Sequence, residues 1–217
     1  MGKTFSATPR PVTVVCLLVM TLMIPMAHAS ILGVGGTAPP SPLVPTGTTL
    51  ATTSGTIFAS TFSADYTTSV LRDPANTFCS GCLDFIYQFT NNGPDVNERY
   101  TMSSFAGFMV DAGTNPFGVH DPITVSRSSI SGGQVVSFNF DQFGDEMQPG
   151  QTTVTLVIET NAVTYTTGFL SAQDGTAGSG VGYAPLSAIP EPSSLALLGG
   201  GLAFVGALLR KSRFGKP

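Results

Sequence analysis

The chain has 217 residues, of which 42% are hydrophobic and only 10% are charged. This length suits one domain of ordinary size, and the composition excludes an intrinsically disordered protein. Six of the nine basic residues lie near the two ends of the sequence, whereas twelve of the thirteen acidic residues lie between them. The acidic middle argues against a nucleic-acid partner, because Lys and Arg supply most of the affinity for phosphates.

The first 29 residues have the pattern of an export signal. Lys3 and Arg10 form a positive n-region, and an apolar core follows at residues 12–24. Ala27 and Ala29 provide a small-x-small cleavage site, which predicts cleavage after Ala29. An uncleaved anchor is the alternative, but a core of about 13 residues is short for a membrane span.

The exported chain divides by composition into a domain and two flanking segments. Residues 30–55 are rich in Gly, Pro and Thr and predict a loose leader. Residues 56–172 alternate short apolar stretches with turn residues, which predicts a β domain. Residues 173–188 are rich in Gly and predict a linker to a C-terminal segment at 189–217.

Period-two alternation of apolar residues predicts the strands of the domain. The clearest example is the sequence LDFIYQFT at residues 83–90, in which Leu83, Phe85, Tyr87 and Phe89 share one face. Residues 134–141, 152–160 and 163–170 have similar patterns, and residues 56–66, 104–113 and 123–130 have weaker ones. We therefore expect an antiparallel β-sandwich of about seven or eight strands.

Cys79 and Cys82 are the only cysteines in the sequence after the export signal. In an oxidising compartment we expect a disulfide that closes a small loop. A redox site is less favoured, because a strand and not a helix follows the pair. A zinc site would need further ligands, and His120 is the only histidine after residue 29.

The sequence offers little for catalysis or for binding a cofactor. His120 has no nucleophilic serine in a recognisable context, since the chain lacks a G-x-S-x-G motif. Asp141, Asp145 and Glu146 could supply oxygen ligands to calcium, but their spacing is not that of an EF-hand loop. We interpret both as solvated loop residues, and we expect no cofactor and no bound metal.

The C-terminal segment has three parts. Pro190, Glu191 and Pro192 form an extended tripeptide, because each proline ring fixes its φ angle. Residues 194–209 form an apolar run, which as a helix would be about 24 Å long and could just span a membrane. The basic cluster Arg210, Lys211 and Arg213 follows and would hold the C-terminus in the cytoplasm.

These three parts resemble the PEP-CTERM sorting signal of proteins exported by Gram-negative bacteria that make exopolysaccharide. The resemblance covers about the last 28 residues, with an additional Phe-Gly-Lys-Pro at the end. It implies processing by exosortase, a multi-pass membrane enzyme, at Pro190-Glu191-Pro192. It also implies a precursor anchored in the inner membrane and a mature protein at the cell surface or in the matrix.

Our main hypothesis is a non-enzymatic, surface-sorted β-sandwich protein of the envelope or of an extracellular polysaccharide matrix. One alternative is a carbohydrate-binding module, which would require exposed aromatic side chains on a sheet; the chain has no Trp but five Tyr. A secreted hydrolase is a further alternative, although no nucleophile and base are recognisable.

Overall fold

The computed structural model describes residues 31–115, 119–141 and 144–186, and within these ranges the chain is all β. Its strands form two six-stranded sheets, with the order β1-β8-β9-β6-β11-β12 in sheet A and β2-β7-β10-β5-β4-β3 in sheet B. Neighbouring strands are antiparallel except β2 and β7, which are parallel. The strands are β1 Thr37–Ala38, β2 Ser41–Pro42, β3 Thr48–Phe58, β4 Phe62–Asp73, β5 Cys82–Pro94, β6 Arg99–Met102, β7 Val110–Asn115, β8 Thr124–Arg127, β9 Val136–Asn139, β10 Thr155–Thr160, β11 Tyr165–Asp174 and β12 Thr176–Pro185.

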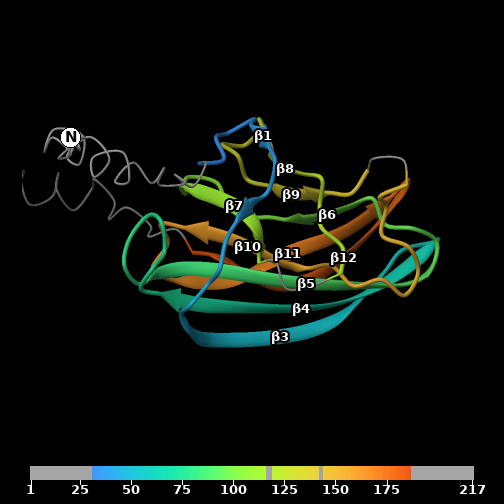
Figure 1. Ribbon diagram of the computed structural model, residues 1–217, viewed down its shortest axis with the longest axis horizontal. Helices are drawn as coiled ribbons and strands as arrows, with labels where there is room; N and C mark the ends of the chain where they lie inside the picture. The colour runs from blue at the N-terminus through green and yellow to red at the C-terminus, as the bar shows by residue number, and fades with distance from the viewer. Residues whose placement is uncertain (1–30, 116–118, 142–143, 187–217) are drawn as a thin grey trace, which may run out of the picture.

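The two sheets pack face to face around one hydrophobic core (Figure 1). Phe89 of sheet B stacks on Tyr100 of sheet A, with ring centroids 4.1 Å apart. The buried hydroxyl of Tyr87 donates to the carbonyl of Tyr183 at 2.8 Å, so a polar group inside the core is satisfied across the two layers. Aromatic packing and this hydrogen bond fix the position of one sheet on the other.

The class of fold that the alternation predicted is confirmed, but the predicted number of strands is wrong. Four predicted strands correspond to β5, β9, β10 and β11, and the weaker pattern at residues 123–130 contains β8. The weaker pattern at residues 56–66 is not one strand, since it contains the turn between β3 and β4, and only the end of 104–113 is strand. Of the strands that were not predicted, β1 and β2 have only two residues each, and β3 and β12 are edge strands rich in Thr or Gly. β6 has only four residues, and most of β4 lies beyond the pattern at residues 56–66, although β4 does alternate buried and exposed side chains.

The predicted leader and linker also need correction. Strands β1 and β2 and much of β3 lie within residues 30–55, and β12 lies within residues 173–188. A linker-like sequence can form β12 because its inward positions face large side chains. A β carbon on Gly178 would lie 2.5 Å from the carbonyl oxygen of Phe58, and one on Gly182 would lie 2.7 Å from Leu170 Cδ2. The small residues therefore reflect close packing and not flexibility.

The predicted export signal and the predicted C-terminal membrane helix lie outside the described residues. Within residues 31–115, 119–141 and 144–186, no helix is long and apolar enough to cross a membrane. The C-terminal end of β12 and the loop between β4 and β5 lie at the same end of the sandwich (Figure 1).

Candidate functional site

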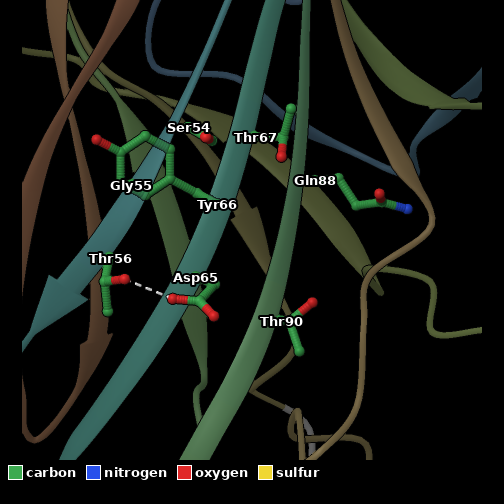
Figure 2. A pocket seen from close by; sticks show the side chains of 8 residues that line it. All are labelled: Ser54, Gly55, Thr56, Asp65, Tyr66, Thr67, Gln88 and Thr90. Carbon is green, nitrogen blue, oxygen red and sulfur yellow. Dashed lines mark hydrogen bonds between the residues drawn. The ribbon is translucent and has the colours of Figure 1, made fainter.

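A shallow polar hollow of about 330 Å³ lies on β3, β4 and β5. Figure 2 shows Asp65, Thr67, Gln88 and Thr90 along the two strands β4 and β5, with Thr56 opposite Asp65 on β3. Period-two alternation brings these side chains to the outer face, because the residues between them point into the core. The hollow can accept a ligand that carries several hydroxyl groups.

Asp65 is the only carboxylate among the residues that line this hollow. The hydroxyl of Thr56 donates to its Oδ1 at 2.6 Å (Figure 2). Hydrogen bonds from Thr56 and then Asn92 lower the pKa of Asp65, so it is ionised at neutral pH and accepts hydrogen bonds. Tyr66 contributes to the wall of the hollow, but its hydroxyl is engaged with the carbonyl of Val181 at 2.8 Å.

A second polar group is buried at the end of sheet B. Asp111 of β7, Glu159 of β10 and Asp84 of β5 are register partners on three adjacent strands, and we call them the carboxylate row. Their exposed fractions are 1%, 6% and 0%. One oxygen of Asp84 and one of Asp111 have no hydrogen-bond partner. Like charges directly opposite one another in a sheet are destabilising, so this arrangement is unusual.

Burial is the main cause of the altered acidity in the row. The pKa of Asp84 is raised to about 8, mainly by desolvation and also by the neighbouring carboxylates Asp73 and Glu159, against a lowering hydrogen bond from Asn76. Desolvation also raises the pKa of Asp111 to about 6, with a hydrogen bond from Ser41 opposing it. Both carboxyl groups therefore favour the protonated form more than an exposed aspartate does.

Sequence reasoning missed the carboxylate row. Alternation in LDFIYQFT assigns Asp84 to the outer face, where a charged residue is ordinarily solvated. The structure places it on that face, but the loop that precedes β5 covers it there, with Asn76 bonded to its carboxylate. The only local signal was an acidic residue near the start of one strong strand pattern, Asp84, and near the end of another, Glu159; antiparallel pairing brings the two together.

The sulfur atoms of Cys79 and Cys82 are in contact, and their Cα atoms lie 5.3 Å apart, within the range for a disulfide. The pair lies at the junction of the β4–β5 loop and β5. The oxidised state of the pair stays a prediction.

The remaining candidates do not form a shared site. His120 Nε2 lies 2.6 Å from the carbonyl oxygen of Asp145, and its ring stacks on Phe140. Asp141 pairs with Arg99 at 3.2 Å, and Glu146 accepts from the backbone N–H of Gly144. Among the residues that the structure describes, no group of three or more His, Cys, Asp or Glu side chains could hold a metal ion.

The predicted sorting residues lie outside the described part of the chain: Pro190, Glu191, Pro192, Arg210, Lys211 and Arg213. The signal-cleavage residues Ala27 and Ala29 also lie outside it. A family model, described as the PEP-CTERM protein-sorting motif, matches residues 188–211. The chain carries a PEP-CTERM sorting motif. This confirms the resemblance inferred from the tripeptide, the apolar run and the basic cluster.

The PEP-CTERM motif implies export, a membrane-anchored precursor and surface sorting by an exosortase-type membrane enzyme. Because the match covers 24 residues of the tail, it describes how the protein is handled and not what the sandwich does. Searches of curated proteins and of solved structures found no match to the chain.

Proposed function

We propose that this protein is a non-enzymatic component of the cell envelope or of an extracellular polysaccharide matrix, delivered by its PEP-CTERM motif. The observation that carries the proposal is the motif at residues 188–211, directly after the last strand of a sandwich that ends at Pro185. In this proposal the sandwich is the cargo, and the tail determines its location.

The state of the polar side chains supports a non-enzymatic role. His120 Nε2 contacts a backbone carbonyl and the ring stacks on Phe140, and among the described residues no Ser, Thr or Cys side chain is hydrogen-bonded to the imidazole. Asp65 in the hollow has no second carboxylate beside it among the lining residues. A hydrolase that uses two carboxylates, or a nucleophile and a base, needs such a pair within reach of one substrate bond.

The tail acts in two stages in this proposal. The apolar run and the basic residues Arg210, Lys211 and Arg213 first hold the precursor in the inner membrane. The enzyme then recognises Pro190, Glu191 and Pro192 and removes the segment from residue 194 onward. An extended tripeptide has the shape that a protease cleft binds, and the proline rings reduce the entropy lost on binding.

Substitution of Glu191 tests this proposal. In a host that expresses exosortase, we expect Glu191→Ala to abolish processing and to leave a longer precursor in the inner membrane. Intact-mass measurement of the surface and membrane fractions distinguishes the two forms. Ser187→Ala is the matched control, because Ser187 lies just outside the matched motif, and it should be processed normally.

Recovery of a full-length C-terminus at the surface of wild-type cells would show that the tail is a plain anchor. Equal processing of Glu191→Ala and wild type would show that the tripeptide is not the recognised element.

A second candidate function is binding of a polysaccharide in the hollow on β3, β4 and β5. The hollow favours it because Asp65, Thr67 and Gln88 present exposed acceptors and donors in one place. A carbohydrate-binding module would present exposed aromatic side chains on a sheet, but Tyr66, Tyr87 and Tyr100 are buried. Hydrogen bonding would therefore have to supply most of the affinity.

A glycan array tests this second candidate. We expect Gln88→Ala to reduce binding of the full-length chain to any retained glycan by about fivefold, because a hydrogen bond between neutral groups contributes about 1 kcal/mol. Ser179→Ala, on the outer face of sheet A, is the control and should bind as wild type does. Equal binding by both variants, or no retained glycan, would exclude the hollow as a glycan site.

A further inference from the structure

The carboxylate row is covered by two segments, one distant from it in the sequence and one that directly precedes the strand of Asp84. The first is residues 41–46, which we call the strap, and the second is the β4–β5 loop, residues 74–81. In the strap, the hydroxyl of Ser41 donates to Asp111 Oδ1 at 3.0 Å. In the loop, Asn76 Nδ2 donates to Asp84 Oδ1 at 2.7 Å and the N–H of Thr77 to Glu159 Oε2 at 3.1 Å.

A fourth carboxylate, Asp73 at the end of β4, joins the strap to the loop. It accepts from the N–H of Thr46 at 2.8 Å and from the N–H of Ala75 at 2.8 Å. Desolvation raises the pKa of Asp73, but these hydrogen bonds outweigh it and hold the pKa below its usual value. Asp73 is therefore ionised, and its charge faces Asp84.

Charge balance in this region has no cationic contribution from the described residues. The acidic groups at this end of sheet B are Asp73 of β4, Asp84 of β5, Asp111 of β7 and Glu159 of β10. The strap and the loop add no further acid or base. Arg72 of β4 is exposed, and within residues 31–115, 119–141 and 144–186 the only ion pair joins Arg99 and Asp141. The described side chains are also not arranged to hold a metal ion. Among the described groups, protonation of the carboxylates themselves is what can neutralise the row.

Loss of these protons would push apart the segments that cover the row. A charged Asp84 would face Asp73 and Glu159 in a site that excludes water, and the repulsion falls only if water enters. β10 and β5 are paired on both sides within sheet B, and β7 is paired with β10 over six residues. The strap pairs with β7 at only two positions, so the strap and the loop are the parts that can move.

We propose that the carboxylate row is a proton-dependent fastening, which holds the strap and the β4–β5 loop against sheet B in acid and releases them as the pH rises. The sign follows from comparison with the unfolded chain, in which an aspartate has a pKa of 3.8. A raised native pKa stabilises the closed form fully below pH 3.8, and this contribution is lost between pH 3.8 and about 8 for Asp84 and about 6 for Asp111. Each such group changes the closing equilibrium by up to about tenfold per pH unit in its window.

Hydrogen exchange of the full-length chain in non-ionic detergent tests the proposal. Protection factors, corrected for the intrinsic rate at each pH, are measured at pH 5 and pH 8.5 for peptides from the strap and the loop, with peptides from β12 as an internal reference. We expect protection of the strap and the loop to fall at least tenfold between the two pH values, and protection of β12 to stay unchanged.

Two isosteric variants separate the row from other causes. Asp84→Asn keeps the shape of the side chain but cannot ionise, so the loop should stay protected at pH 8.5. Asp121→Asn removes an exposed carboxylate elsewhere and should keep the wild-type response. If Asp84→Asn does not fold, Asp111→Asn serves the same purpose and should reduce the response of the strap between pH 5 and pH 7.

Three results would overturn the proposal. The first is equal protection of the strap and the loop at both pH values in the wild type. The second is a fall that includes β12 to the same extent, which would mean global unfolding. The third is a wild-type response in both the Asp84→Asn and the Asp111→Asn variants.

Discussion

Two buried groups of ionisable side chains hold the N-terminal part of the domain, and they differ in how fully their polar atoms are hydrogen-bonded. Arg127 of β8 is 6% exposed and donates to four backbone carbonyls, those of Leu32, Phe105, Phe108 and Gly133. The carboxylate row is equally buried but has two oxygens without a donor. Leu32 is attached to the first region, and the strap is attached to the second.

The difference comes from the chemistry of the partners. A carbonyl oxygen only accepts hydrogen bonds, and a guanidinium only donates them, so Arg127 can be satisfied by backbone alone. Burial lowers the pKa of Arg127, but an arginine remains charged throughout the physiological range. Carboxylates that face one another need protons as well. Thus residues 31–46 are held at one point by Arg127, which is insensitive to pH, and at another by the carboxylate row, which in our proposal is sensitive to pH.

Arg127→Met would break the first fastening and should give the largest effect. Four carbonyls would lose the hydrogen bond from the guanidinium, and we expect the free energy of unfolding to fall by about 4 kcal/mol, equally at pH 5 and pH 8.5. Urea unfolding followed by circular dichroism measures this loss. Arg99→Met is the control, since Arg99 and Asp141 form an exposed ion pair, and it should cost about 1 kcal/mol or less.

A loss for Arg127→Met that is no greater than for Arg99→Met would contradict the role given to the buried guanidinium. A loss that differs between the two pH values would contradict the stated difference between the two regions.

Gly113→Ala would separate the strap from the Arg127 region, with a smaller effect on stability than Arg127→Met. A β carbon at Gly113 would overlap the carbonyl oxygen of Ser41, so alanine should displace β2 from β7 at a cost of about 2 kcal/mol. Leu32 should stay attached through Arg127, and the pH response of the strap should disappear. Gly33→Ala is the control, because no atom lies within 4 Å of its β carbon and it should be neutral.

Hydrogen exchange of residues 31–46 in the Gly113→Ala protein reports on both the attachment of Leu32 through Arg127 and the attachment of the strap to the carboxylate row. Loss of protection at Leu32 together with the strap would show that the two regions act as one and not separately.

The sequence predicts those strands whose identity is encoded locally. β5, β9 and β10 alternate large apolar side chains with polar ones, and a short window is enough to recognise them. β12 has glycines at its inward positions because Tyr66 and Leu170 occupy the space. Its identity as a strand therefore depends on side chains from other elements, which a local pattern does not contain.

The same reasoning explains which functional residues could be predicted. Pro190, Glu191 and Pro192 form a linear motif, which is recognisable without a fold. Asp84 and Asp111 are on outward-facing positions and are buried only because the strap and the loop cover them. Ser41 and Asp111 are 70 residues apart in the sequence, so their contact follows from topology alone.

The position at which β12 ends determines how near the sorting motif stays to the sandwich. The N–H of Leu186 still donates to the carbonyl of Thr164, so the chain is fixed to the domain up to that residue. Pro190 is only four residues further on, and four extended residues span at most about 14 Å. An enzyme that grips Pro190-Glu191-Pro192 must therefore leave steric clearance for a folded domain against its entrance. In our proposal the sandwich is thus a bulky neighbour of the processed tripeptide, and the loops beside Thr164 are part of the surface that the enzyme would encounter.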